Sequence, residues 1–393
     1  MRSNFKRLGN YIEELSIKNI DLTVETLLGV SMRKVLIPSI ANIIGSDMSK
    51  YKIIKRNQFG YGPVTSRNGD KISIALLTEF DKAIISQSYK VFDIKDKEEL
   101  LPEYLMMWFS RPEFDRYARF MSHGSTREAF DWEELCEVEL PIPPIEEQKA
   151  IVAEYKTVTD RIKLNEQINI KLEETAQALY RHWFVDFEFP DKNGKPYKSS
   201  GGNMVFNEEL EKEVPEGWEV MSLGDLFVLQ RGFDLPTRKR TEGIYPIYAS
   251  TGVSSYHNEF KIEPPGVVTG RSGSLGEVFF VDERFWALNT TLWIKEFKRV
   301  NPVYSFFYLS NINISEFQSG SAVPTLNRNH IHMHRTYCPS FRLQEKFQSY
   351  YLKINRKSNN LKLENKKCKY LQSLLLSKMA GSKTSNHKKA TTV

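Results

Sequence analysis

The sequence predicts a mixed α/β protein with two related domains in tandem, each followed by a long helix. Three observations support this: a degenerate repeat spans most of the chain, heptad periodicity closes each half, and short apolar runs alternate with polar turns. We expect the two long helices to form an antiparallel two-helix coiled coil between the domains, which gives the chain a pseudo-two-fold repeat. The alternative is a pair of amphipathic helices that pack only on their own domains.

The repeat is clearest in two stretches that are 196 residues apart. Residues 124–151 align with residues 320–347 without a gap, so that Pro143 meets Pro339 and Gln148 meets Gln344. Upstream, further segments match in the same order while the offset rises gradually to 215, as differences in loop length would produce. The period is far too long for a solenoid and indicates two domains of one design.

Changes of composition set the expected boundaries. The linker is rich in Pro, Gly, Ser and Lys, and the end of the chain is polar and basic. The predicted parts are a first domain 1–143, a first spacer helix 144–189, a linker 190–216, a second domain 217–340, a second spacer helix 341–380 and a disordered tail 381–393.

The long helices are predicted from apolar or packing residues at alternating steps of four and three. The first helix follows Pro143 and Pro144, which suit a helix start. Asn169 and Asn365 occupy equivalent positions, and a buried Asn in such a seam can fix its register. The predicted seam consists of Ile151, Tyr155, Val158, Ile162, Asn169 and Leu172 in the first helix, and Phe347, Tyr351, Ile354, Leu361 and Asn365 in the second.

Within each domain, runs rich in β-branched and aromatic residues predict strands, and two apolar stretches predict short buried helices. The strands are expected at 71–79, 84–92, 276–283 and 287–297, and the helices at 103–114 and 303–312.

Composition and sequence pattern argue against a secreted, a membrane-spanning or a disulfide-rich protein. The 393 residues are 40% hydrophobic and 26% charged, as in globular proteins, and the net charge of +6 is compatible with nucleic acid. Because we find no secretory signal, no membrane span and only three widely spaced cysteines, we expect a cytoplasmic protein with reduced thiols.

Four fragments resemble catalytic or metal-binding motifs, and none is complete. "NPVY" (301–304) is close to the Asn-Pro-Pro-Tyr loop of adenine methyltransferases, but its repeat partner lacks the Asn, so a helix start is the better interpretation. "PD" at 190–191 has no second carboxylate before a lysine, as a metal nuclease needs. "HIHMH" (330–334) does not recur in the first half, so an exposed edge or loop is favoured over metal ligation. "SGS" (272–274) is no nucleophile elbow. We therefore predict no catalytic residue, no metal and no bound cofactor.

Basic segments recur at parallel places in both halves. Arg and Lys can hold phosphates or read guanine, and Asn can read adenine; the alternative is ordinary solvated turns. The predicted DNA-binding residues are Lys52, Lys55, Arg56, Arg67 and Asn68 in the first domain, and Arg231, Arg238, Lys239, Arg240, Arg271 and Ser272 in the second.

Four segments resemble the specificity subunit of type I restriction–modification systems: "PIPPIEEQKAIV" (141–152), "RHWFVDFEFPDKNGKPYKSSGG" (181–202), "VPEGWEVMSLGDL" (214–226) and "GSAVPTLNRN" (320–329). The resemblance implies two target recognition domains that each read half of a split double-stranded DNA target. It also implies that the subunit is not catalytic and recruits two methyltransferase subunits, which bind S-adenosylmethionine, and restriction subunits, which use ATP and Mg.

The second copy departs from the first, because Ser340 replaces Pro144 and Leu343 replaces Glu147, so its helix is expected to start differently. A helix of about 36 residues is roughly 54 Å long, which separates the domain centres by up to roughly 16 base pairs. The alternatives are a stand-alone DNA methyltransferase or nuclease, a coiled-coil scaffold that does not read DNA, and a silent variant without partners.

Overall fold

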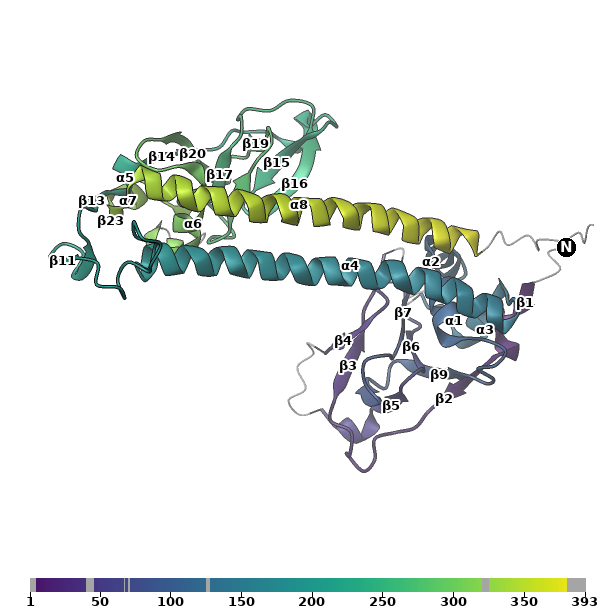
Figure 1. Cartoon of the computed structure of the whole chain (residues 1–393). Helices are drawn as coiled ribbons and strands as arrows, with labels where there is room; N and C mark the ends of the chain where they lie inside the picture. The colour runs from purple at the N-terminus through teal and green to yellow at the C-terminus, as the bar shows by residue number, and fades with distance from the viewer. Residues whose placement is uncertain are drawn as a thin grey trace, which may run out of the picture. The chain divides into compact units, whose positions relative to one another are not determined.

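The structure, a computed structural model, describes residues 5–39, 46–66, 68–69, 71–124, 128–319 and 325–379. The chain forms two compact units, one of residues 1–165 with 362–393 and the other of residues 166–361. Two long helices, α4 (Ile145–Tyr180) and α8 (Phe341–Lys378), each contribute residues to both units (Figure 1). No helix among the described residues has the length and apolar character needed to cross a bilayer.

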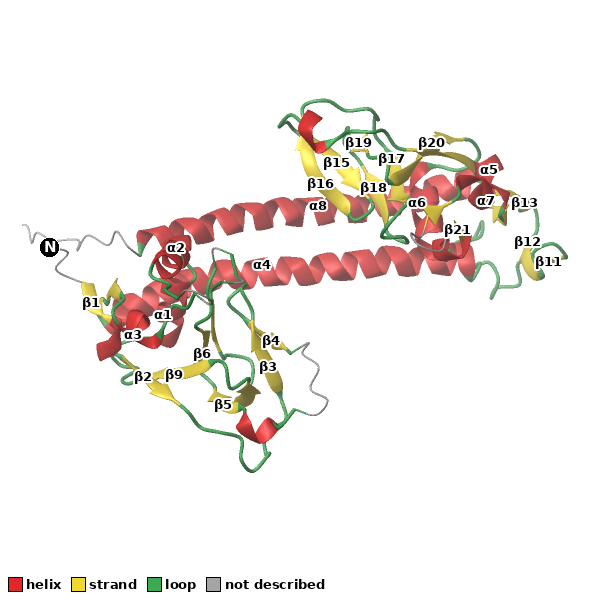
Figure 2. Ribbon diagram, turned by 180° about the vertical axis from the view of Figure 1, so that it is seen from behind, coloured by secondary structure: helices red, strands yellow, loops and turns green. Residues whose placement is uncertain are grey.

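Two sheets build the domain of the first unit (Figure 2). The antiparallel sheet has the order β2-β9-β6-β7, with β2 (Ile12–Leu15), β9 (Lys90–Ile94), β6 (Phe59–Gly62) and β7 (Ser73–Leu76). The mixed sheet has the order β4-β3-β8-β5, with β4 (Leu36–Pro38), β3 (Leu27–Val30), β8 (Lys82–Ile85) and β5 (Lys52–Lys55); β3 and β8 are parallel. A separate pair joins β1 (Phe5–Arg7) to β10 (Glu139–Pro141). The helices are α1 (Pro102–Phe109), α2 (Pro112–Phe120) and α3 (Trp132–Cys136).

Aromatic side chains fill the core between the antiparallel sheet and α1. Phe59 and Phe92 stack with their ring centroids 4.7 Å apart, and Phe109 of α1 meets Phe59 edge-on. The two sheets also approach closely at Gly60, where a Cβ atom would lie 3.1 Å from Val30. Glycine at this position therefore lets β6 lie against the second sheet.

The second unit repeats this topology. Its antiparallel sheet has the order β14-β20-β17-β18, with β14 (Phe227–Arg231), β20 (Thr291–Phe297), β17 (Gly266–Gly270) and β18 (Val278–Val281). The smaller sheet has the order β16-β15-β19, with β16 (Gly252–His257), β15 (Tyr245–Ala249) and β19 (Trp286–Ala287); β15 and β19 are parallel. The pair β13 (Glu219–Ser222) and β23 (Arg335–Cys338) corresponds to β1 and β10. The helices are α5 (Leu223–Leu226), α6 (Pro302–Asn311) and α7 (Arg328–Met333). Two further antiparallel pairs join β11 (Met204–Asn207) to β12 (Lys212–Pro215), and β21 (Gln318–Ser319) to β22 (Thr325–Leu326). The duplication that the repeat predicts is thus present in the strand order.

Three elements that the sequence predicts as continuous are divided by turns. The stretch 84–92 contains the end of β8 and the start of β9, because Tyr89 N–H donates to Ser86 O at 3.0 Å and closes a turn. The stretch 287–297 is divided in the same way before Thr291, whose N–H donates to Leu288 O at 2.9 Å. The predicted helix 103–114 ends at Phe109, and Pro112 starts α2.

A buried glutamine fixes the start of α4 to the first domain. Gln148 is fully buried, and its Oε1 accepts from Leu101 N–H at 2.9 Å. Its Nε2 donates to Glu99 O and to Pro143 O, both at 2.8 Å. One side chain thereby connects the loop before α1 with the loop before α4.

Gln344 makes the same three bonds at the start of α8. Its Oε1 accepts from Asn301 N–H at 2.9 Å, and its Nε2 donates to Arg299 O at 3.2 Å and to Pro339 O at 2.9 Å. Ser340 Oγ accepts from Leu343 N–H at 3.4 Å, so this helix starts with a hydroxyl where α4 follows a proline. The repeated segment therefore encodes the joint between each domain and its long helix.

The long helices contact each other within the first unit and also contact their own domains. Asn165 Nδ2 donates to Asn365 Oδ1 at 2.8 Å, and Arg161 Nε lies 2.7 Å from Glu364 Oε1. Tyr155 packs against the core of the first domain. Of the predicted seam, Ile162, Asn169, Phe347, Tyr351, Leu361 and Asn365 are buried, and Ile151, Tyr155, Val158, Leu172 and Ile354 are half-buried.

The repeat is not symmetric at the buried asparagines. It places Asn169 where the second half has Asn365, and Asn165 where the second half has Leu361. Asn165 Nδ2 therefore finds an amide partner, whereas the Oδ1 atoms of both Asn165 and Asn169 are buried without a hydrogen bond to any described residue.

Candidate nucleic-acid interface

Three loops of the second domain converge at one end of its antiparallel sheet. Arg231 ends β14, and Arg271 follows directly on β17. Main-chain bonds hold the second loop: Arg271 N–H donates to Thr290 O, and Arg271 O accepts from Leu326 N–H, both at 2.8 Å. The second of these bonds brings the segment before α7 against the loop after β17.

These loops enclose a cavity of about 390 Å³, which we name the guanidinium cradle. The sequence predicts two of its arginines as DNA ligands, and the structure brings them together. The cradle is lined by Arg231, Arg271, Leu292, Thr325, Leu326, Asn327, Arg328 and Asn329.

The guanidinium groups of the cradle have no carboxylate partner among the described residues. Arg231 Nε donates to Asn289 O at 3.3 Å, and the side chains of Arg271 and Arg328 have no hydrogen bond or ion pair within the described chain. Burial, together with the nearby charge of Arg231, lowers the pKa of Arg271. The cradle therefore concentrates positive charge that has no paired carboxylate within the described part of the chain.

Three residues of the cradle with amide or guanidinium side chains, Asn327, Arg328 and Asn329, are not among the predicted DNA ligands. They belong to the segment 320–329, which supports the repeat and the family resemblance but contributes no predicted DNA ligand. Asn327 caps α7 by accepting from Asn329 N–H at 3.0 Å. The sequence could have indicated these residues, because an arginine stands between two asparagines in a segment that belongs to the repeat.

The other predicted residues of the second domain lie elsewhere. Arg238 and Lys239 are exposed on the short turn η4 (Thr237–Lys239), without a side-chain bond to any described residue. Arg240 supports its own loop, since Nε donates to Leu235 O at 3.3 Å and a terminal nitrogen donates to Ser255 Oγ at 3.2 Å. Ser272 bridges to Thr325 through the main chain.

The predicted residues of the first domain are held mainly by local contacts. Lys52 Nζ donates to Tyr89 O at 2.8 Å, and burial lowers its pKa. Arg56 pairs with Asp81 at 2.9 Å and donates to Thr78 O, while Asn68 Nδ2 donates to Val64 O at 3.0 Å. Lys55 is exposed, and Arg67 lies outside the described residues. The structure does not gather these residues into one cavity.

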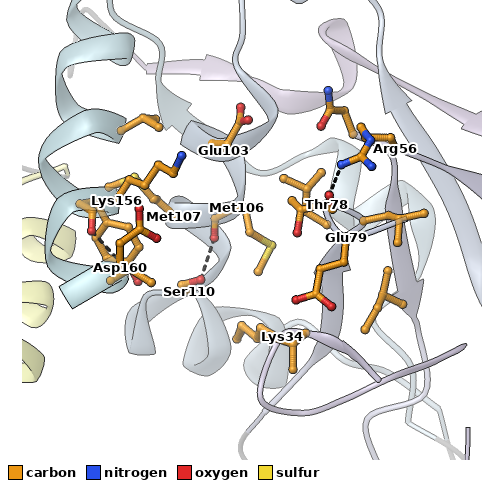
Figure 3. Close-up of a pocket in the computed structure, with 18 of the residues that line it drawn as sticks. Lys34, Arg56, Thr78, Glu79, Glu103, Met106, Met107, Ser110, Lys156 and Asp160 are labelled. Atoms are coloured by element: carbon orange, nitrogen blue, oxygen red, sulfur yellow. Dashed lines mark hydrogen bonds between the residues drawn. The ribbon is translucent and has the colours of Figure 1, made fainter. Parts of the chain in front are cut away.

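A larger cavity of about 500 Å³ lies in the first unit between β-strand ends, α1 and α4 (Figure 3). Arg56 and Glu79 line one side, and Met106 of α1 and Asp160 of α4 line the other. Acidic side chains share its lining with lysines and methionines, so this cavity is not suited to a polyanion.

The histidines of 330–334 form neither an exposed edge nor a metal site. They lie in and directly after the helix α7, where alternate residues do not share a face. His332 Nε2 accepts from Leu229 N–H at 2.9 Å and ties α7 to β14. Among the described residues no group of three potential metal ligands comes together. Asn301, the first residue of "NPVY", caps α6 by accepting from Tyr304 N–H at 2.8 Å, which agrees with a helix start.

Comparisons with known proteins agree with the resemblance. A family model described as the type I restriction modification DNA specificity domain matches residues 41–174 and 215–334. The MjaIX specificity subunit of Methanocaldococcus jannaschii is 35% identical over 147 residues, which are 37% of this chain and 32% of that protein. The HindI specificity subunit of Haemophilus influenzae is 30% identical over 139 residues, which are 35% of this chain and 30% of that protein. The matched region thus spans about a third of each relative.

A crystal structure extends the likeness in fold to nearly the whole chain. The S subunit of a type I restriction–modification system from M. genitalium aligns with 97% of this chain and 96% of its own, with a TM-score of 0.59 and 16% identity. At this identity the likeness concerns the fold alone.

Proposed function

Because the chain belongs to the family of type I restriction–modification DNA specificity subunits, we propose that it reads a split DNA target for a multisubunit methyltransferase and endonuclease. Each domain binds one half-site, and an unspecified gap of fixed length separates the half-sites. The chain recruits two methyltransferase subunits, which carry S-adenosylmethionine, and restriction subunits, which carry ATP and Mg. It takes no part in the chemistry itself.

The observation that best supports this proposal is the duplicated domain, whose second copy carries a cluster of arginines with no carboxylate partner among the described residues. Phosphate groups dominate the affinity of proteins for DNA and are bound by such arginines. A methyltransferase or nuclease of its own would need a cofactor loop or paired carboxylates, and the sequence offers neither. A coiled-coil scaffold that does not bind DNA would not require a cavity lined by three arginines.

The spacer is the second part of the proposal. We infer that α4 and α8 pair antiparallel as a coiled coil and set the distance between the two half-sites. The amide pair of Asn165 and Asn365 supports this, because a buried polar pair at one seam position favours a single register. Glutamines 148 and 344 then hold each domain to the start of its helix, so that the spacing of the helices is transmitted to the domains.

Co-expression with the methyltransferase subunit encoded beside this chain tests the proposal. Adenine methylation is then mapped across the host DNA by single-molecule sequencing. We expect one split motif of two short half-sites around a constant gap. A soluble complex that leaves no motif would favour the scaffold or the silent variant, and methylation by this chain alone would favour the enzyme.

A further inference from the structure

We propose that the guanidinium cradle of the second domain is a clamp for a single DNA phosphodiester, which positions the duplex and does not read bases. This inference rests on the proposed function, since it presumes that the chain binds double-stranded DNA. It assigns a task to Arg231, Arg271 and Arg328 and separates that task from sequence reading.

The charge of the cradle supports an anionic ligand. Three guanidinium groups and two amide side chains line one cavity, and no carboxylate among the described residues lines it. Arg271 is half-buried, and burial together with the nearby charge of Arg231 lowers its pKa, so the two like charges repel each other across a partly desolvated space. A phosphodiester would relieve this repulsion and accept charge-assisted hydrogen bonds from both groups.

The shape of the cradle favours a phosphate over a base. Base edges lie at the bottom of grooves about 8 Å deep, so the side chains that read them must project from the protein. Arg271 is half-buried in a hollow that the exposed side chains of Arg231 and Arg328 also line, and a hollow fits the phosphate groups that project from the duplex. The part of the chain that the structure describes places no aromatic side chain in the lining of the cradle to stack on an extruded base.

The cradle is also held in place before DNA arrives. Main-chain bonds to Thr290 and Leu326 fix the loop that carries Arg271, and Asn289 O accepts from Arg231 Nε. The Nε2 atom of His332 anchors α7, the helix that begins with Arg328, to β14. Binding therefore requires little reordering of these elements, which favours affinity.

The first domain lacks part of this clamp at the matching place. The repeat aligns Arg271 with Arg67, which lies outside the described residues. The repeat aligns Asn327, Arg328 and Asn329 with Asp131, Trp132 and Glu133, and it aligns Arg231 with Ser16. Asp131 and Glu133 are exposed, so they present negative charge where the second domain presents a guanidinium. Two of the three arginines of the clamp, Arg231 and Arg328, are therefore specific to the second domain.

The test measures DNA binding by the full chain in complex with its methyltransferase subunits. Two duplexes serve as probes, one with the mapped target and one with the same base composition in scrambled order, between 50 and 200 mM salt. We expect Arg271→Ala and Arg328→Ala to weaken binding to both duplexes equally, by roughly ten- to hundredfold. The slope of log K against log salt should fall by about one for each variant, and the methylated motif should stay the same.

Arg284→Ala is the matched control, because Arg284 belongs to the same domain and already pairs with Glu263 at 2.9 Å. Its affinity and slope should equal those of the unchanged protein, and thermal unfolding shows whether each variant is folded. Inorganic phosphate at millimolar concentration should raise the unfolding temperature of the unchanged protein more than that of Arg271→Ala.

Two results would overturn the clamp. The first is a motif that relaxes at one position while binding to the scrambled duplex is unchanged, which would make the cradle a base reader. The second is unchanged affinity and slope in folded Arg271→Ala and Arg328→Ala. Failure of the proposed function can be distinguished from failure of the clamp. If the proposed function is wrong, the complex without any substitution would show no split methylation motif and would bind both duplexes equally.

Discussion

Replacement of Gln344 by alanine should destabilise the second unit more than any surface substitution. The fully buried side chain makes three hydrogen bonds, and its removal leaves Asn301 N–H, Arg299 O and Pro339 O without this partner. A buried polar group that loses its partner costs ~1–3 kcal/mol. The low end of this range applies to the carbonyl groups, because they keep a second lone pair, so we expect a loss of about 3–5 kcal/mol.

Urea unfolding followed by tryptophan fluorescence measures this loss, and hydrogen exchange locates it at the amide of Asn301. Gln167→Ala is the control, because Gln167 is exposed on α4; it should change stability by less than about 0.5 kcal/mol. Gln148→Ala should produce a similar loss in the first unit, where the same three bonds recur. If Gln344→Ala unfolded at the same urea concentration as the control and kept its amide protection, the glutamine joint would not hold the domain to the helix.

Three further predictions concern the spacer and the second domain. Asn169→Leu should stabilise the protein by about 1–3 kcal/mol, because it removes a buried oxygen without a partner. Asn165→Leu should be less favourable than Asn169→Leu, because it also removes the donor to Asn365 Oδ1, while Asn365 Nδ2 keeps its bond to Ile162 O. Urea unfolding of both variants decides this, and equal effects would contradict it. Burial, with the charges of Arg328 and Lys298, lowers the pKa of His332, so the unfolded imidazole binds protons more readily than the folded one. Stability should therefore fall as the pH drops below about 6.5, and thermal unfolding of His332→Gln should depend less steeply on pH in that range. Insertion of seven residues into both α4 and α8 should lengthen the gap in the methylated motif by about three base pairs, and an unchanged gap would contradict the spacer model.

The parts of the fold that sequence predicts well are those in which many residues repeat one pattern. The 196-residue offset identifies the duplication, and the heptads locate both long helices, because each rests on numerous side chains. The short turns at Ser86–Tyr89 and Leu288–Thr291 escape prediction because a single hydrogen bond interrupts a run that still alternates like one strand.

The candidate site is harder to predict, because its residues come from three separate loops. Arg231 and Arg271 stand out by type, but only the bond from Leu326 N–H to Arg271 O reveals that Arg328 lies beside them. In the first domain, Arg56 has the residue type expected of a DNA ligand, but its side chain forms an ion pair with Asp81. Whether a basic residue is free to meet DNA depends on neighbours that are distant in sequence.

An exchange of one domain tests the central claim most directly. Residues 217–340 would be replaced by the corresponding domain of a relative with a different methylated motif, and the methylation of the host DNA would be mapped again. We predict that one half-site changes to that of the relative while the other half-site and the gap stay the same. A motif that changes in both halves, or in neither, would contradict the claim that each domain reads its own half of the target.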